Sequence, residues 1–278
     1  MALFSSTQSG NWNDPAMWGG AGVPDMSVDD ALINPGHEVI VPSGLYVSVY
    51  DGHAVIVMEN ATLRIQGGMD IGDGAFFVLG HVIAEGNHLA LWGTTTAEIW
   101  ASGQLEVSTN FYLDGATMTV DGLFSVYGGY AYISFGAALT IASGYWELYG
   151  GWAYVEYGPH VTVDFGGMYI DYGSGVDLYD SATLTIQQNG YVDVYGNLYL
   201  YYYPVIEVFG YFGLEENGYL YVDYESRINV YRHVYLSGRM YGGGRIVMLR
   251  REGRVLDYYG NPLIVHDQAY GFGVAQVA

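Results

Sequence analysis

The sequence predicts an all-β fold: a single-stranded parallel β-helix, or β-solenoid, of about nine coils of 21–23 residues, with three short strands per coil and a cap at each end. Three observations lead to this prediction: a repeat near 22 residues, alternating stretches within each repeat, and the composition. The 278 residues include 41 glycines and 29 tyrosines but only 7 prolines, and 13% of them are charged. Short strands joined by tight glycine turns have this composition.

The repeat appears as a short strand whose last residue is apolar and recurs every 21–23 residues. In a solenoid such positions stack from one coil to the next, about 4.8 Å apart. The nine positions are Val57, Val78, Ile99, Val120, Ile141, Val163, Ile186, Val208 and Val230.

Two further strands follow in each coil, for example at 145–149 and 153–157. Because side chains alternate between the two faces of a strand, the third strand divides into an inward apolar set and an outward set of tyrosines and acids. The inward set is Ile133, Val155, Leu178, Leu200 and Val222. The outward set is Tyr132, Tyr154, Asp177, Tyr199 and Tyr221, with Ser134, Glu156, Tyr179, Tyr201 and Asp223 two residues later. We expect these tyrosines to stack between coils.

The ends of the chain lack the repeat. Residues 1–36 are expected to form an N-terminal cap and residues 37–238 the solenoid body, while residues 239–278 form an arginine-rich cap or docking element. The candidate docking residues are Arg239, Arg245, Arg250, Arg251 and Arg254.

The net charge of −21 is distributed unevenly along the chain. Residues 1–226 contain 26 acids against one base, Arg64, whereas residues 227–278 contain seven arginines and three acids; there is no lysine. An acidic body repels nucleic acid and anionic membranes, so neither is an expected partner, and no apolar run is long enough for membrane insertion. A basic end on an acidic body can attach to an acidic surface or to another copy, which predicts a homo-oligomer or a multicopy component.

Cysteine is absent, which excludes disulfides and thiolate sites. The first residues do not combine a basic stretch with an apolar one, so we expect no secretory signal.

The N-terminal 40 or so residues contain a distinctive pattern: Ser9-Gly10-Asn11-Trp12, Asp14-Pro15, Trp18-Gly19-Gly20, Val23-Pro24, Asp30-Ala31-Leu32-Ile33 and Gly36-His37-Glu38-Val39. This pattern resembles the first segment of right-handed parallel β-helices in bacterial surface proteins and G8-like domains. Asp29 stands where that family usually has glycine, and Met17 where it has threonine. The resemblance implies a right-handed coil and a surface or secreted context. Parallel β-helices also build phage tailspikes and other virion proteins.

No catalytic residue is assigned. Pectin-cleaving β-helices depend on basic residues, whereas this body is nearly free of arginine and the chain has no lysine. The acid pairs Asp29-Asp30 and Glu215-Glu216 point to opposite faces of a strand, which does not suit glycoside hydrolysis. The outward threonines Thr119, Thr140, Thr162 and Thr185 form a single column, and β-propensity explains it better than ice binding does.

No metal or cofactor is assigned either. The seven histidines show no metal-ligand spacing. The turn at 67–74, with Asp70 and Asp73, resembles a calcium-binding Gly/Asp turn and leaves calcium there as an open question.

The tyrosine face is the main candidate site, with Tyr132, Tyr154, Tyr179, Tyr199, Tyr201 and Tyr221 as its residues. Exposed aromatics beside carboxylates suit sugars and protein interfaces alike. The first functional hypothesis is a non-enzymatic structural component of a larger assembly, such as a phage capsid decoration or tail protein located in the virion. The alternative is a carbohydrate-binding adhesin or secreted surface module, and a third possibility is a tailspike-like polysaccharide depolymerase.

Overall fold

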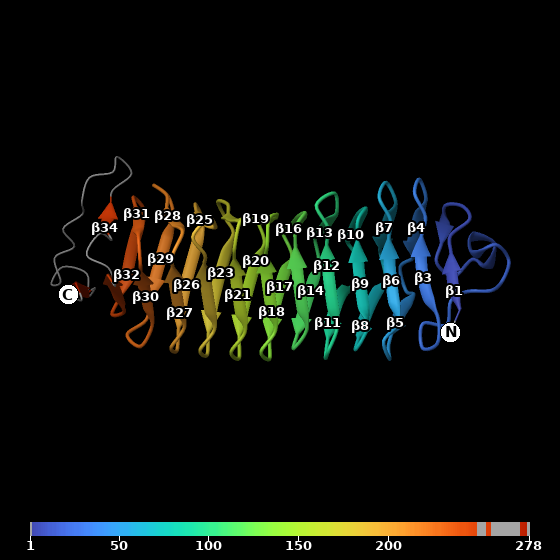
Figure 1. Cartoon of the computed structure of the whole chain (residues 1–278), viewed down its shortest axis with the longest axis horizontal. Coiled ribbons are helices and arrows are strands. Elements are labelled where there is room, and N and C mark those ends of the chain that lie inside the picture. The colour runs from blue at the N-terminus through green and yellow to red at the C-terminus, as the bar shows by residue number, and fades with distance from the viewer. Residues whose placement is uncertain (1, 249–253, 257–272, 277–278) are drawn as a thin grey trace.

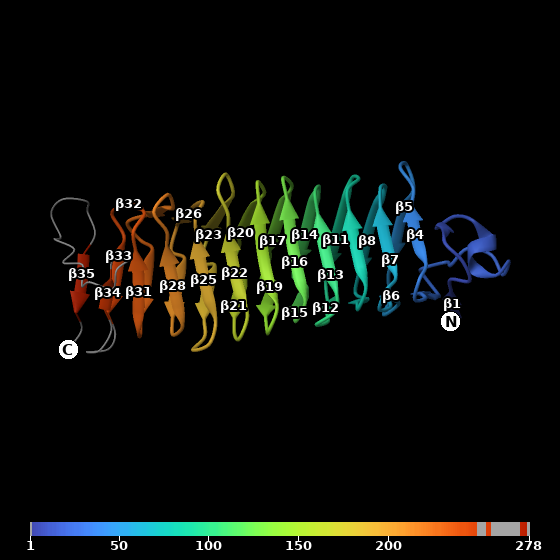
Figure 2. The ribbon, with the colours of Figure 1, turned by 90° about the horizontal axis from the view of Figure 1, so that it is seen from above.

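The computed structural model describes residues 2–248, 254–256 and 273–276. The chain winds into a straight rod, with residues 3–5 and 273–276 toward opposite tips (Figure 1). Three parallel sheets, A, B and C, run along the rod, which confirms the predicted β-solenoid with three strands per coil. After a rotation of 90° about the long axis of the rod, the coils show the same regular stacking (Figure 2). In the described part of the chain, no helix is long and apolar enough to cross a membrane.

Sheet A contains the strand that begins each coil. Its 13 strands pair in the order of the chain. They are β1 (Leu3–Ser5), β3 (Asp30–Ile33), β6 (Ala54–Val57), β9 (Ala75–Val78), β12 (Thr96–Ile99), β15 (Thr117–Val120), β18 (Ala138–Ile141), β21 (His160–Val163), β24 (Thr183–Ile186), β27 (Val205–Val208), β30 (Arg227–Val230), β33 (Arg245–Met248) and β35 (Gly273–Gln276).

Sheet B follows sheet A in each coil after a short turn, which contains a glycine in most coils. Its 12 strands also pair in chain order. They are β2 (Gly10–Asn11), β4 (Glu38–Val41), β7 (Thr62–Ile65), β10 (His81–Ala84), β13 (Gln104–Val107), β16 (Leu123–Tyr127), β19 (Tyr145–Tyr149), β22 (Gly167–Ile170), β25 (Tyr191–Val194), β28 (Tyr211–Leu214), β31 (His233–Leu236) and β34 (Arg254–Leu256).

Sheet C closes each coil, and it carries the predicted tyrosine face. It has 10 strands. They are β5 (Tyr46–Val49), β8 (Gly68–Gly72), β11 (His88–Trp92), β14 (Asn110–Asp114), β17 (Tyr130–Ser134), β20 (Trp152–Glu156), β23 (Gly175–Tyr179), β26 (Asn197–Tyr201), β29 (Tyr219–Val222) and β32 (Arg239–Gly242).

The predicted register is confirmed along the whole body. Val57 pairs with Val78, and the pairing continues without a slip through Ile141 to Val230. Ten coils are complete, one more than predicted, because Ile33 on β3 pairs with Val57. The additional coil was missed because its strand lies 24 residues before the next one, outside the 21–23-residue period.

The inward columns form one continuous apolar core. Ile133, Val155, Leu178, Leu200 and Val222 stack in register on sheet C and are buried, as predicted. Aromatic rings fill the wider part of the core: Phe124 lies 5.1 Å from Phe111 and stacks at 5.9 Å on Trp146. Because each coil packs only on its neighbours, the core extends with the rod without thickening it.

Glycines occupy the corner between sheets A and B because adjacent coils approach closely there. A Cβ at Gly144 would lie 1.9 Å from the carbonyl oxygen of Gly122, and one at Gly166 would lie 2.2 Å from that of Gly144. No other residue type fits without moving the backbone. The high glycine content therefore follows from coil stacking.

The N-terminal segment adds β1 and β2 to sheets A and B and covers the first complete coil. A short 3₁₀ helix, η1 (Pro15–Trp18), is capped by the Asp14 carboxylate, which accepts from the Ala16 amide at 2.9 Å. Trp12 and Trp18 are buried edge to face, 5.2 Å apart, and the Trp18 indole donates to the Trp12 carbonyl at 2.8 Å. The tryptophans and the Asp-Pro turn of the N-terminal pattern therefore close the core at this end.

We expect the inward and outward positions of one strand to respond differently to truncation. Ile141 on β18 is fully buried, so Ile141→Ala should lower the free energy of unfolding by about 2–5 kcal/mol. The matched control, Thr140→Ala, removes an outward side chain and should cost less than about 1 kcal/mol. Denaturant unfolding followed by circular dichroism measures both, and equal losses would contradict the assignment of faces.

Candidate functional site

The six tyrosines predicted from the sequence lie together on the outer face of sheet C. Tyr132, Tyr154, Tyr199 and Tyr221 share one column with Asp177 between them, while Tyr179 and Tyr201 occupy the column two residues later. All six are half-buried. The face assignments made from alternation are therefore confirmed.

The rings on this face stack on one another. Tyr132 lies 5.0 Å from Tyr112 and 5.3 Å from Tyr154, with interplanar angles of 10° and 16°. Tyr179 stacks on Tyr201 at 5.0 Å. Stacked rings cover each other's faces, so these columns present hydroxyl groups and ring edges to solvent. Burial raises the pKa of Tyr154 and, to about 12, that of Tyr201, so both hydroxyls stay protonated at neutral pH and can donate hydrogen bonds.

The column of rings is interrupted at Asp177. Trp152 leans over Gly175, where a Cβ would lie 2.5 Å from its ring, and stacks on Tyr199 at 6.2 Å. Asp177 is consequently only 8% exposed. Burial raises the pKa of its carboxyl group, and the neighbouring Trp152 and Tyr179 side chains lower it by a smaller amount. The Tyr179 hydroxyl donates a hydrogen bond to Asp177 Oδ2 at 3.2 Å. Oδ1 has no hydrogen-bond partner among the described residues.

A second aromatic feature follows the corner where sheet C turns into sheet A. We call it the corner ridge, and its side chains are far more exposed than those of the columns, from 53% for Tyr157 to 72% for Tyr224. Phe135 and Tyr157 stack at 5.2 Å. The ridge consists of Phe135, Tyr157, Tyr202, Tyr203 and Tyr224.

Four residues of the ridge adopt a backbone conformation that large side chains avoid. The φ angles of Phe135, Tyr157, Tyr202 and Tyr203 lie between 53° and 72°. For an ordinary L-residue this left-handed region costs about 1–2 kcal/mol. At the same corner of earlier coils, the residues in the left-handed conformation are ones that tolerate it, namely Asp51, Asp73, Gly93 and Gly115. Exposed rings on strained backbone make this corner a candidate binding surface.

Carboxylates border the corner ridge without a basic partner. Asp114 is the last residue of β14, and Glu156 is the last residue of β20. Asp180 directly follows β23, in the coil between those of Tyr157 and Tyr202. Burial, and then the charges of Asp180 and Asp114, raise the pKa of Glu156. The sequence contains no lysine or arginine between Arg64 and Arg227, so the edge around Phe135, Tyr157 and Asp180 has acids and no arginine or lysine, whereas Arg227 follows Tyr224 at its far end.

Sequence reasoning missed the corner ridge because its residues fall in turns, where no alternation marks a face. The available signal was the pairing of a large aromatic with glycine, Phe135-Gly136 and Tyr157-Gly158, at positions where earlier coils have Asp-Gly or glycine alone. In a turn, a ring that is not needed for packing is a candidate for binding.

Sheet B carries its own tyrosines around a partly buried acid, Asp193. Gly213 leaves the space for it, since a Cβ there would lie 2.9 Å from Asp193 Oδ1 and 2.8 Å from the Tyr211 hydroxyl. Burial, and then Glu215, raise the pKa of Asp193 to about 6. Burial also raises the pKa of Glu215.

The two aspartates of the Gly/Asp turn at 67–74 form hydrogen bonds with other residues of the protein. Asp70 accepts from the Tyr46 hydroxyl and lies 2.9 Å from His88 Nε2, and Asp73 accepts from the amide of Thr94 at 2.8 Å. In the part of the chain that the structure describes, no three histidine, aspartate or glutamate side chains come together as metal ligands.

The predicted docking arginines are placed only in part. Arg239 on β32 and Arg245 on β33 are exposed, on sheets C and A respectively. The backbone of Arg254 belongs to β34, whereas Arg250 and Arg251 lie outside the described residues. Arg227 and Arg232, which were not singled out, are also exposed on these last coils.

Fold and surface together define a three-sheet parallel β-helix with an aromatic and acidic edge. No family model and no curated protein matches the chain. Among solved structures, one that matches is the crystal structure of a TibC-catalysed, hyper-glycosylated fragment of TibA, 16% identical, with 98% of this chain and 100% of the other covered and a TM-score of 0.31. A likeness at this level says nothing about what the chain binds.

Asp193 should make stability depend on pH. Its pKa rises from an ordinary value of 3.8 to about 6 on folding, so the folded chain binds this proton more tightly than the unfolded chain does. The stabilisation is present below about pH 4 and is lost as the pH rises through about 6. After allowance for solvent screening, this group should lower the free energy of unfolding of the wild type by roughly 1 kcal/mol as the pH rises over this interval. Asp193→Asn should not show this decrease. Urea unfolding between pH 4 and 7 measures it, and exposed Glu216→Gln is the charge-matched control.

The strain at the corner ridge predicts an unusual response to substitution. Asparagine tolerates the left-handed conformation, so Tyr202→Asn should leave the free energy of unfolding unchanged or raise it by up to about 1 kcal/mol. Tyr201→Asn, one residue earlier, removes a ring stacked at 5.0 Å on Tyr179 and should lower it by about 1 kcal/mol. Thermal and urea unfolding compare the two, and a larger loss for Tyr202→Asn would refute the strain argument.

Proposed function

We propose that the protein is a non-catalytic surface module that binds glycans along the corner ridge and the adjoining edge of sheet C. The observation that carries the proposal is the set of large, exposed aromatic side chains held in left-handed backbone. A sugar ring presents an apolar face of C–H groups, and an exposed aromatic ring is a surface on which that face can pack.

The acids beside the ridge supply the polar half of such a site. Tyr157 and Tyr202 flank the coil that carries Asp180, so their backbones are two coil spacings, roughly 9.6 Å, apart. One face of Tyr157 is covered by Phe135, and in the described structure no ring stacks on the other. A sugar seated there would meet ring faces beside Glu156 and Asp180, whose carboxylates can accept hydrogen bonds from its hydroxyl groups.

The charge of the edge limits the class of glycan. Asp114, Glu156 and Asp180 lie on the part of the edge that has no lysine or arginine, so an anionic polysaccharide would be repelled there at neutral pH. Neutral sugars and sugars with a free amino group fit the edge. Exposed rings recur along the ridge at Phe135, Tyr157, Tyr202 and Tyr224, so a polymer can make several weak contacts at once, and its avidity exceeds the affinity of one unit.

A second candidate function is attachment to a larger assembly, including a virion. The observation that favours it is the position of Arg227, Arg232, Arg239 and Arg245, all exposed on the last coils of an otherwise acidic rod. The two functions are compatible, because the basic end would attach the rod while the aromatic edge faces outward. The comparisons lend no support to the virion location.

The direct test is a glycan array of neutral, amino-bearing and acidic oligosaccharides, followed by calorimetry on the best ligand. Wild-type protein is expected to bind neutral or amino-bearing glycans, and Tyr157→Asn and Tyr202→Asn should each weaken binding by roughly tenfold. Their matched control is Trp100→Ala, which removes an aromatic that is 50% exposed at the corner between sheets A and B and should leave binding unchanged.

Two outcomes would contradict the proposal. An array without a neutral or amino-bearing ligand, or equal losses in Trp100→Ala and Tyr202→Asn, would remove the ridge as a glycan site. Release of reducing ends from a bound polysaccharide would instead favour the depolymerase hypothesis.

A further inference from the structure

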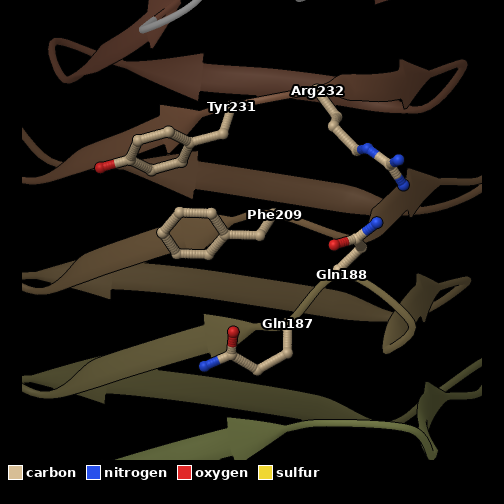
Figure 3. A pocket seen from close by; sticks show the side chains of 5 residues that line it. All are labelled: Gln187, Gln188, Phe209, Tyr231 and Arg232. Carbon is tan, nitrogen blue, oxygen red and sulfur yellow. The ribbon is translucent and has the colours of Figure 1, made fainter.

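A hollow of 210 Å³ lies at the corner between sheets A and B, on the last coils of the rod (Figure 3). It is built by residues that follow successive strands of sheet A: Gln187 and Gln188 after β24, Phe209 after β27, and Tyr231 and Arg232 after β30. The hollow belongs to neither the corner ridge nor sheet C.

The two sides of the hollow differ in chemistry. Phe209 and Tyr231 stack at 4.1 Å and form an aromatic wall. On the other side the guanidinium of Arg232 and the amide of Gln188 point toward one another, with Gln187 below Phe209 (Figure 3). Within the described chain, the side chains of Gln187, Gln188 and Arg232 form no hydrogen bond or ion pair. Several hydrogen-bond donors therefore converge beside an apolar surface, and the described residues 2–248 offer them no side-chain partner.

Arg64 shows what a structural arginine looks like in this molecule. Its guanidinium bonds to Glu38 and Glu85, each at 3.0 Å, so its positive charge is fully engaged by carboxylates of the protein. Arg232 is exposed and has no described carboxylate partner, although acids outnumber bases 29 to 8 in the chain. Among the described residues, no carboxylate competes with a ligand for its guanidinium.

A planar carboxylate is the natural partner of this set of donors. Guanidinium binds carboxylate in a two-pronged arrangement, and the amide groups of Gln187 and Gln188 can add further hydrogen bonds. The aromatic wall favours a ligand that carries its carboxylate on a ring. The volume is below the roughly 300–1,000 Å³ of pockets that enclose drug-sized ligands, which limits the ligand to about one sugar unit.

We propose that this corner hollow binds a carboxylated sugar, a hexuronic acid, through Arg232 and Gln188, with the sugar ring against Phe209 and Tyr231. The site does not depend on glycan binding by the corner ridge, which is acidic and lies at a different corner. The rod would then have two sites with opposite charge preferences.

Saturation-transfer NMR with full-length protein and sodium D-glucuronate tests the proposal. Transfer to glucuronate should exceed transfer to D-glucose, should weaken with added sodium chloride, and should not be abolished by sodium acetate at equal concentration. Arg232→Ala should weaken binding about tenfold, as expected for loss of charge-assisted hydrogen bonds, and Gln188→Ala should weaken it to a smaller extent. Arg239→Ala removes an exposed arginine from sheet C and should change nothing.

Circular dichroism and melting curves first establish that each variant is folded. Equal transfer to glucose and glucuronate would overturn the role of the carboxylate, and equal competition by acetate would overturn the role of the ring. Equal losses in Arg232→Ala and Arg239→Ala would show a diffuse charge effect and refute the site. Since Tyr202→Asn leaves this corner untouched, failure of the ridge and failure of the hollow give separate results.

Discussion

The parallel hydrogen-bond ladder between successive coils is the interaction on which every other feature of this protein depends. It places the same strand position of each coil directly over that of the coil before, about 4.8 Å away, as in the pairing of Tyr132 with Tyr154. Any side chain on the surface must therefore tolerate its counterpart at this distance. Neutral rings do so by stacking, whereas carboxylates repel one another. The high tyrosine and low lysine content of the chain suits this constraint.

Possible sites arise where the columns are interrupted. Glycine at 175 lets Trp152 lean across a coil and bury Asp177, and glycine at 213 leaves room for Asp193 and Tyr211. At Gly175 the ring comes from the preceding coil, and at Gly213 it comes from the same strand, so in both cases a glycine makes room for a ring. The acid beside that ring then loses solvent, which raises its pKa.

The corner ridge shows a different use of the same scaffold. Phe135, Tyr157 and Tyr202 hold large rings in left-handed backbone where Asp51 and Gly93 serve earlier coils at lower cost. The ladder on both sides of the corner fixes the backbone, so the strain persists in the folded state. Such a local loss of stability in exchange for an exposed surface is common at functional sites.

The sequence by itself determined the solenoid, its register and the faces of its strands. The period links Val57 to Val230, and alternation separates Ile133 from Tyr132, because coil stacking and strand pleat are both periodic and leave a trace in the order of residues. The turns have no such periodicity. Only the tertiary structure decided that Tyr157 and Tyr202 stand exposed beside Asp180. It also decided that Gln188 and Arg232, 44 residues apart in the sequence, face the same hollow, because these arrangements depend on how the corners of separate coils align.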